Sequence, residues 1–359
     1  MTDNLDLFGD ADVPASPTAS ARPATAGHPE KKKPVGKTVE PWTQDAALTA
    51  LARRLPPNLY FGTSSWSYPG WHGMVYDGQY TESLLSRNGL RACGQHPLLR
   101  AAGIDRGFYG PIPLADYLKY AAQVPEDFRF LVKAPASVCD AWLRGPDGAG
   151  RLANAAFLNP EIAVRDFIAP ATGGLGPRCG PLLFQLSPLQ NIADDGPAFF
   201  ARLDAFLAAL PPLDPTLTPH ACYAVELRDA SLLTPRYIRL LRDRSVRFCL
   251  AARDRLPPVS RQAHAQMLMD DGAPGPLVLR WMLREGRSYA MAEQAYAPFD
   301  KLADADDTTR DAIAEVVVRT LHAGQPAYVI VSNNAEGCAP LSIARLAAAI
   351  ADRLEARPA

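Results

Sequence analysis

Short apolar runs alternate with longer amphipathic segments from about Trp42 onwards. Eight of the runs have the length of strands and are rich in β-branched and aromatic residues. They cover residues 59–63, roughly 102–109, 128–133, 182–186, 222–227, 248–252, 277–281 and 327–331. Several, such as Tyr328-Val329-Ile330-Val331, are continuously apolar. Such runs are typical of strands that are buried on both faces of a parallel sheet.

The segments between these runs have helical patterns. The clearest helices are predicted over residues 113–123, 197–210, 234–242, 307–322 and 341–353. Thr234 and Pro235 provide an N-cap and a proline at the first helical position, and Asp306 or Asp307 caps a later helix. Alternation of strands and helices indicates a parallel sheet, and eight strands are the number that closes a TIM-type barrel. The Pro- and Gly-rich stretch 142–180 predicts an excursion at the rim, with one helical piece near 160–167.

The first 41 residues have a different composition. They are rich in Pro, Ala, Thr and Ser, and almost no large apolar residue follows Phe8. Such a stretch cannot offset its own ordering entropy, so residues 1–41 are predicted to be a disordered tail. The remaining residues, 42–359, suit a single α/β barrel domain, which typically needs about 250 residues.

Charge and cysteine usage narrow the classes of function. The chain has 37 basic and 38 acidic residues, so no global field attracts nucleic acid or an anionic membrane. The six cysteines form no CxxC pair, which favours reduced core thiols over a disulfide framework. Residues 1–12 lack a signal-peptide pattern, and no apolar run approaches the roughly 18 residues of a membrane span. The expected compartment is the cytoplasm.

Polar and aromatic residues follow the apolar runs, and in a TIM barrel the carboxyl ends of the strands form the site. Two candidates for chemistry are Lys133 and Glu226. The candidates for ligand binding at the same mouth are Ser65, Trp66, Tyr68, Tyr109, Gln185, Arg228, Arg280, Asn333 and Asn334.

These residues fall in motifs that resemble the YecE-like proteins, the bacterial family known as domain of unknown function seventy-two. The motifs are Gly62-Thr63-Ser64-Ser65-Trp66-Ser67-Tyr68 with Trp71, Phe128-Arg129-Phe130 with Lys133-Ala134-Pro135, Leu183-Phe184-Gln185-Leu186, Val225-Glu226-Leu227-Arg228, and Asn333-Asn334 with Gly337. They occur in the family's order over about residues 60–346. The resemblance implies a TIM barrel with its site at these motifs and without a settled activity.

The chain departs from the family pattern at two places. Gly103 stands where the second strand usually carries a Glu, and Arg280-Trp281-Met282-Leu283 replaces an Arg-Phe-His-Gly stretch after the seventh strand. If that Glu or His takes part in the family's chemistry, this member is altered or inactive.

Each candidate also has a structural interpretation. Glu226 is either an acid/base group or half of an ion pair with Lys133, Arg228 or Arg280. Lys133 is either an amine whose neighbours lower its pKa, ready to anchor or attack a substrate, or a barrel-lining lysine paired with a carboxylate.

The other candidates also have both a functional and a structural interpretation. Arg280 suits a carboxylate or phosphate ligand, although no Gly-rich phosphate loop follows it. Of Asn333 and Asn334, we expect one to orient a ligand and one to form the turn before the next helix. The aromatic residues Trp66, Tyr68, Trp71 and Tyr109 either form a wall that stacks on a ligand or pack a long rim loop.

Two signals bear on metals and partners. Of the six histidines only His72 lies near the predicted rim, and the candidate carboxylates Glu226, Asp229 and Asp254 are few, so neither a metal nor another cofactor is expected. In the tail, Asn4 precedes Leu5-Asp6-Leu7-Phe8, which is similar to the short peptide that bacterial proteins dock on the DNA-polymerase sliding clamp. An ordinary tail without a partner explains the same residues.

Three functions follow as hypotheses. The first is a barrel that binds a small polar or anionic organic ligand, with Glu-mediated acid/base chemistry of the hydrolase, isomerase or lyase type. The second is a non-catalytic partner protein that the tail recruits to the sliding clamp. The third is a metal-dependent barrel resembling a nuclease.

Overall fold

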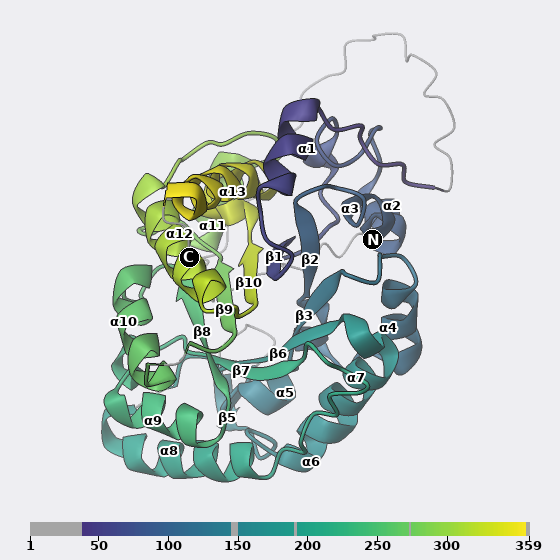
Figure 1. The fold of residues 1–359 in the computed structure, drawn as a ribbon. Coiled ribbons are helices and arrows are strands. Elements are labelled where there is room, and N and C mark those ends of the chain that lie inside the picture. Colours follow the sequence, from purple (N-terminus) through teal and green to yellow (C-terminus); the bar gives the residue numbers. More distant parts are fainter. Residues whose placement is uncertain (1–37, 145–149, 190–191, 273, 357–359) are drawn as a thin grey trace, which may run out of the picture.

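A closed barrel of parallel strands forms the centre of the molecule (Figure 1). The computed structural model describes residues 38–144, 150–189, 192–272 and 274–356. Around the barrel the strands follow the order β1-β10-β9-β8-β7-β6-β3-β2. Their bounds are β1 Leu59–Thr63, β2 Leu99–Ile104, β3 Arg129–Lys133, β6 Cys179–Gln185, β7 Cys222–Glu226, β8 Arg247–Ala252, β9 Leu277–Trp281 and β10 Ala327–Val331. The predicted TIM-type fold is confirmed.

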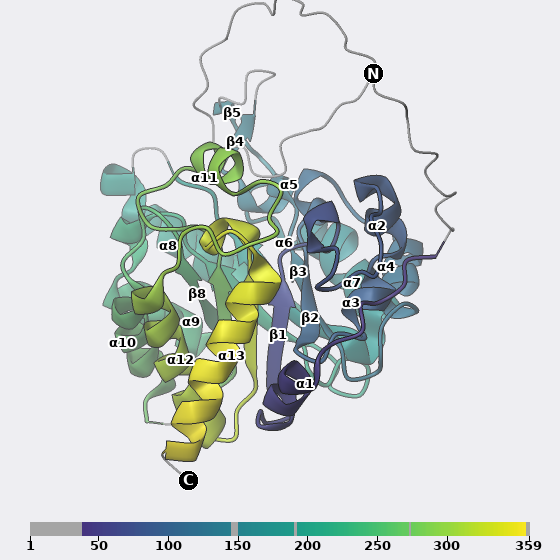
Figure 2. The same ribbon diagram turned by 90° about the horizontal axis from the view of Figure 1, so that it is seen from above.

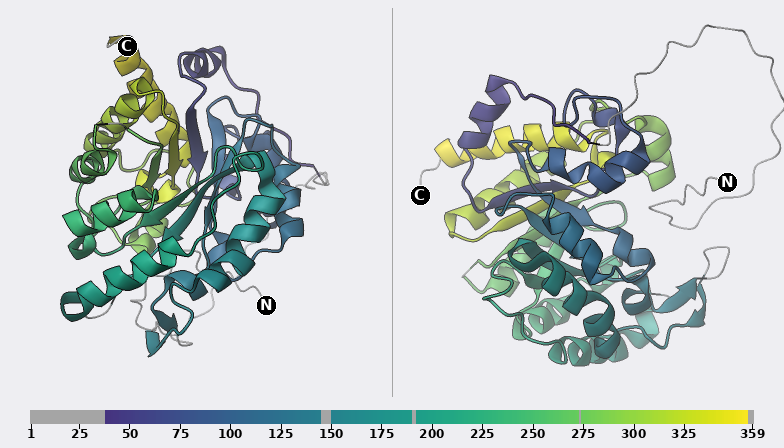
Figure 3. Two further views of the ribbon diagram at one scale, coloured as in Figure 1. Left: turned by 60° about the horizontal axis from the view of Figure 1, so that its bottom comes forward. Right: turned by 90° about the vertical axis from the view of Figure 1, so that its right-hand side faces the viewer.

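Helices surround the barrel on its outer side, as Figures 1 and 3 show from different directions. They include α4 Leu114–Ala121, α7 Ala169–Leu175, α8 Ile192–Ala208, α9 Pro235–Asp243, α10 Val259–Asp270, α12 Asp307–His322 and α13 Ala339–Ala356. The others are α1 Ala46–Arg53, α2 Glu82–Asn88, α3 Leu90–Cys93, α5 Ala136–Cys139, α6 Pro160–Ala163 and α11 Tyr289–Tyr296. The five helices predicted from the sequence all exist, with ends shifted by a few residues.

The second strand differs from its prediction. Strand β2 begins at Leu99 and ends at Ile104, and a 3-10 turn follows over Arg106–Tyr109. The prediction of a strand over 102–109 was therefore wrong in its second half. A Cβ atom on Gly103 would lie 3.2 Å from the carbonyl oxygen of Ser64, so this glycine allows the chain to pass close to the end of β1.

The interior of the barrel is a packed core rather than a pore. Its cluster consists of Tyr60, Ala101, Leu131, Leu183, Ala224, Cys249, Val278, Tyr328 and Ile330. The rings of Tyr60 and Tyr328 stack with their centroids 5.0 Å apart. Because side chains fill the barrel, a ligand has access only at its ends.

The excursion predicted over 142–180 is present and contains more structure than expected. A hairpin of β4 Trp142–Arg144 and β5 Gly150–Ala153 leaves the barrel after β3. The chain then forms α6, a π-helical turn at Val164–Ile168, and α7, which packs against α4. A Cβ atom on Gly174 would lie 2.4 Å from the Cβ of Tyr117, so only glycine permits this close helix contact.

Residues 38–41 belong to the folded part of the chain. Val39 is buried, and Pro41 forms a bridge with Tyr76. The backbone N–H of Trp42 donates to the carbonyl of Val75 at 2.9 Å. The folded part of the chain thus begins a few residues before residue 41, where the end of the tail was expected. The clamp-like motif at residues 4–8 lies outside the described residues.

The predicted N-cap of α9 is confirmed, because the Thr234 hydroxyl accepts from the backbone N–H of Tyr237 at 3.3 Å. We expect Thr234→Ala to lower the free energy of unfolding by about 1 kcal/mol, since a first-turn donor loses its partner. Urea denaturation measures this change. Thr308→Ala is the matched control, since Thr308 is exposed and its side chain forms no hydrogen bond within the described residues. Equal losses in the two variants would contradict the capping role.

No helix in the described part of the chain is long and apolar enough to cross a membrane.

Candidate functional site

A cluster of charged side chains lies at the carboxyl ends of the barrel strands, with Arg280 from β9 at its centre. The Nη1 group of Arg280 donates to Gln185 Oε1 at 2.9 Å and to Glu226 Oε2 at 2.8 Å. Its Nη2 group donates to Asp105 Oδ2 at 2.8 Å. Arg280 is 1% exposed, so both of its terminal nitrogens are committed to protein partners. The Nε–H group of Arg280 is buried and has no hydrogen-bond partner within the described residues.

Glu226, the last residue of β7, lies at the bottom of this cluster. Its side chain is fully buried and forms ion pairs with Arg280 and, at 2.8 Å, with the Nε of Arg228. Burial alone would raise the pKa of the Glu226 carboxyl, but the two guanidinium groups outweigh burial and hold that pKa below its usual value. The surroundings of Glu226 therefore agree with its interpretation as one half of an ion pair. An ionised carboxylate that is held by two arginines is a weak base.

Arg228 connects the buried cluster to its outer edge. Its Nη2 group donates to Gln185 Oε1 at 2.5 Å, so the same amide oxygen accepts from both arginines. The Arg228 side chain is about 10% exposed, in contrast to Arg280. The hydroxyl of Tyr289, at the start of α11, lies beside Arg228. In Figure 2, α11 lies on the same side of the barrel as α5 and the β4–β5 hairpin, over the carboxyl ends of the strands.

Lys133, the last residue of β3, has a different environment. Its Nζ lies 3.9 Å from the centre of the Phe108 ring, and the residue is 9% exposed. Within the described residues, no carboxylate lies within 4.0 Å of this amine. Burial lowers the pKa of Lys133 to about 8; Asp105 and Glu226 counteract this shift and Arg280 and Arg228 add to it. The environment is thus that of an amine with a lowered pKa, and not that of a lysine in a close ion pair.

Asp105 is a member of the cluster that sequence reasoning missed. It follows β2 directly, and its Oδ2 accepts from Arg280 while its buried Oδ1 has no hydrogen-bond partner in the described part of the chain. Because the strand was predicted to continue to residue 109, Asp105 was not recognised as a strand-end residue. The polar residue directly after Ile104 was the signal that could have located it. Asp105 supplies a carboxylate at the end of β2, two residues after Gly103.

The aromatic candidates have different roles. Trp66 donates from Nε1 to the carbonyl of Ser86 at 3.1 Å, and Trp71 donates to Asn333 Oδ1 at 3.2 Å. Both indoles are buried, as expected if they pack the rim loop. Tyr109 is 60% exposed and lies edge-on to Phe108.

Tyr68 lies close enough to Asp105 for that carboxylate to act on its hydroxyl group. Its ring packs against Trp71 and Phe299. Burial and the nearby Asp105 carboxylate raise the pKa of the Tyr68 hydroxyl, so this group remains a proton donor at neutral pH.

The polar residues after β10 and β1 hold the backbone. Asn333 Oδ1 accepts from the backbone N–H of Ala339 at 2.8 Å, at the start of α13. The N–H of Asn334 donates to the hydroxyl of Ser332 at 3.2 Å, and its carbonyl accepts from Arg284. Ser65 forms a 3.3 Å hydrogen bond with Ser67. The structure therefore brings together five of the predicted site residues, Lys133, Gln185, Glu226, Arg228 and Arg280. Ser65, Asn333 and Asn334 instead form hydrogen bonds with residues outside this group.

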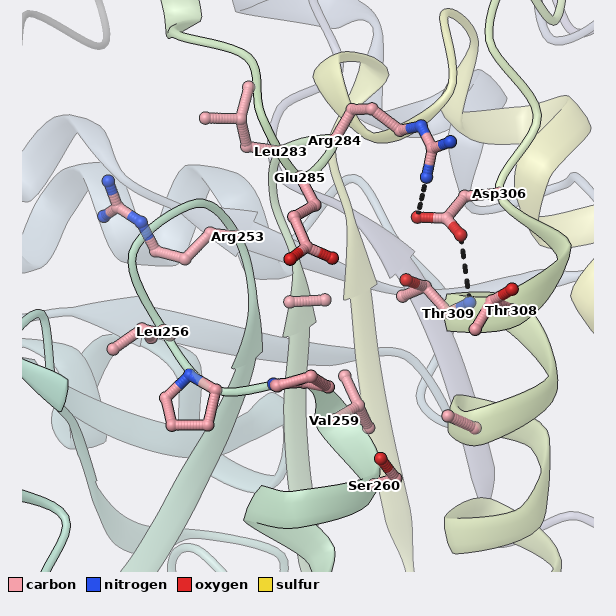
Figure 4. A pocket seen from close by; sticks show the side chains of 14 residues that line it. Arg253, Leu256, Val259, Ser260, Leu283, Arg284, Glu285, Asp306, Thr308 and Thr309 are labelled. Atoms are coloured by element: carbon pink, nitrogen blue, oxygen red, sulfur yellow. Dashed lines mark hydrogen bonds and ion pairs between the residues drawn. The ribbon is translucent and has the colours of Figure 1, made fainter.

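A separate cavity of about 270 Å³ lies between the N-terminal ends of α10 and α12 (Figure 4). Its charged lining includes Arg253, Arg284, Glu285 and Asp306. Arg284 forms an ion pair with Asp306 at 2.5 Å, and Asp306 also caps α12 by accepting from Thr309. None of the predicted site residues lines this cavity, so it is distinct from the Arg280 cluster.

The described residues contain no group of three His, Cys, Asp or Glu side chains that could hold a metal ion.

Comparisons with known proteins identify the family. The chain is similar to the crystal structure of a DUF72 family protein from Enterococcus faecalis, with a TM-score of 0.55, 16% identity, and coverage of 81% of this chain and 95% of that one. For a DUF72 family protein from Thermotoga maritima the TM-score is 0.49 at 16% identity, with coverage of 83% and 99%. No curated protein sequence matches the chain. A family model with the description "Protein of unknown function DUF72" matches residues 60–359. Since this match covers the whole barrel, the chain belongs to the DUF72 family.

Proposed function

We propose that the carboxyl-end mouth of the barrel binds a small anionic organic ligand, and that Lys133 is the group that contacts it. The observation that carries the proposal is the asymmetry of the Arg280 cluster. The side chains of Glu226 and Arg280 are almost completely buried. About a tenth of the surface is exposed for Lys133, Asp105 and Arg228. A ligand that enters from solvent therefore meets Lys133, Asp105 and Arg228 before it meets Glu226 or Arg280.

Charge favours an anion at this edge. The cluster contains three basic groups, from Lys133, Arg228 and Arg280, and two acidic groups, from Asp105 and Glu226. A protonated Lys133 thus leaves one positive charge in excess in a poorly solvated place, where charge interactions are strong. We assign the acid/base role to Lys133 and not to Glu226, because the Lys133 amine changes protonation near neutral pH.

A thermal-shift screen of the full chain against small carboxylates, sugar phosphates and nucleotides tests the proposal. At a hundred-fold excess over its Kd, a ligand stabilises the folded state by about 2.7 kcal/mol. We expect Lys133→Met to remove most of this stabilisation. Lys119→Met is the matched control, because Lys119 lies on α4 and pairs with Asp116 at the surface. A ligand that stabilises Lys133→Met as strongly as the unchanged chain would contradict the proposed contact.

A further inference from the structure

The side chains around Lys133 point to a covalent role for its amine. We propose that Lys133 forms an imine with a small carbonyl compound that carries a carboxylate, such as a 2-oxo acid. This inference rests on the proposed function and names its substrate class. Imine formation needs an unprotonated amine, access to the carbonyl carbon, and a proton donor for the departing oxygen.

The position of Lys133 bears on the first two needs, since the residue lies at the mouth of the barrel and is 9% exposed. Lys133 lies at the end of a barrel strand, where its rigid backbone fixes the base of the side chain. The Phe108 ring covers one side of the amine, and the charged groups that act on it are Asp105, Arg280, Arg228 and Glu226. The absence of a carboxylate within 4.0 Å, among the described residues, leaves the nitrogen lone pair free once the proton is lost. With a pKa of about 8, roughly a tenth of the amine is neutral at pH 7.

Two other side chains meet the remaining need and select the substrate. Tyr68 keeps its hydroxyl proton at neutral pH and lies close enough to Asp105 for the two groups to interact, and we assign to it the protonation of the oxygen that leaves. The partly exposed Arg228 guanidinium suits a carboxylate on the substrate. A neutral carbonyl compound would lack this second anchor.

The reaction balances with water as its only by-product. The Nζ lone pair attacks the carbonyl carbon, and a proton moves from nitrogen to oxygen to give a carbinolamine. The hydroxyl then takes a proton and leaves as water while the C=N bond forms. Borohydride reduces the imine: hydride adds to the imine carbon and water protonates the nitrogen, so that a stable secondary amine remains.

Reductive trapping tests the inference on the full chain. The chain is incubated with pyruvate or glyoxylate at pH 7, borohydride is added, and peptide mapping by mass spectrometry locates the adduct. We expect Lys133 to be trapped at least about ten-fold faster than Lys119 and Lys301, which are exposed and serve as internal references in the same sample. Acetone, a neutral carbonyl compound, should react more slowly than pyruvate. The adduct at this position should be lost in Lys133→Arg.

The outcomes separate this inference from the proposed function. Equal trapping at Lys133, Lys119 and Lys301 would overturn the imine. A ligand whose thermal shift depends on Lys133, together with equal trapping, would leave the proposed binding intact and exclude the covalent step. Trapping that is selective for Lys133 but equally fast with acetone would exclude the Arg228 anchor and the 2-oxo acid as substrate class.

Discussion

Arg280→Met should lower the free energy of unfolding by about 3–5 kcal/mol, which is the usual cost of removing one partner from a buried ion pair. The loss arises because Asp105 and Glu226 each lose a charge-assisted hydrogen bond of 2.8 Å, in a place that water hardly reaches. Methionine fills much of the volume of the arginine stem, so the change measures charge pairing more than packing. Urea denaturation at pH 7 measures it.

Arg54→Met is the matched control for this substitution. Arg54 also binds two carboxylates, those of Asp352 and Glu355, but its side chain is 36% exposed. We expect a much smaller loss there than for Arg280→Met, since exposed pairs contribute little. Adding Glu226→Gln to Arg280→Met should cost less than the sum of the single changes, because the neutral amide no longer needs a cation. Additive losses would show that the two residues do not interact.

The stability of the chain should depend on pH through Lys133. Its pKa is about 8 in the folded chain and 10.5 for the ordinary side chain, so the unfolded chain binds more protons between these values. The free energy of unfolding therefore rises with pH across this window, by an amount on the order of 3 kcal/mol, and below pH 8 the buried charge lowers stability. The neighbouring Cys139 thiol, whose pKa is raised by burial, stays protonated there.

Urea denaturation from pH 7.5 to pH 10.5, with Lys133→Met measured in parallel, isolates this effect. The pKa values of Tyr68 and Tyr289 are raised by desolvation in the folded chain. Ionisation of these tyrosines in the unfolded chain therefore lowers the free energy of unfolding as pH rises near 10, in both proteins. The difference in stability between the two proteins removes that shared contribution. A difference that stays constant over the window would show that Lys133 titrates as an ordinary lysine.

The barrel could be predicted because its signal is strong and local. Seven of the eight strands were located to within three residues at either end, since runs such as Ala327–Val331 are apolar throughout and bounded by turn residues. The error at β2 came from Phe108 and Tyr109, because aromatic residues are common in strands and these two were predicted to end one. In the structure they lie in a turn that carries the Phe108 ring over Lys133.

The site was only partly predictable, because its pairing depends on distances across the barrel. The sequence predicted that Lys133, Glu226 and Arg280 lie at the same end of the barrel. It did not predict which acidic groups form ion pairs with which basic groups. Tyr289 was missed because no helix was predicted between residues 282 and 306. Ser288, which caps α11 by accepting from the N–H of Met291, was the available signal.

The β4–β5 hairpin has a consequence for how copies of the chain can meet. Closure of the barrel pairs both sides of each of its eight strands, so the barrel offers no strand edge to a neighbouring molecule. Within the described residues, β4 and β5 are the strands that pair on one side only, and Leu143 and Leu152 on them are 49% and 67% exposed. Self-association by strand addition would therefore begin at this hairpin, and a charged residue at Leu152 would suppress it without touching the barrel.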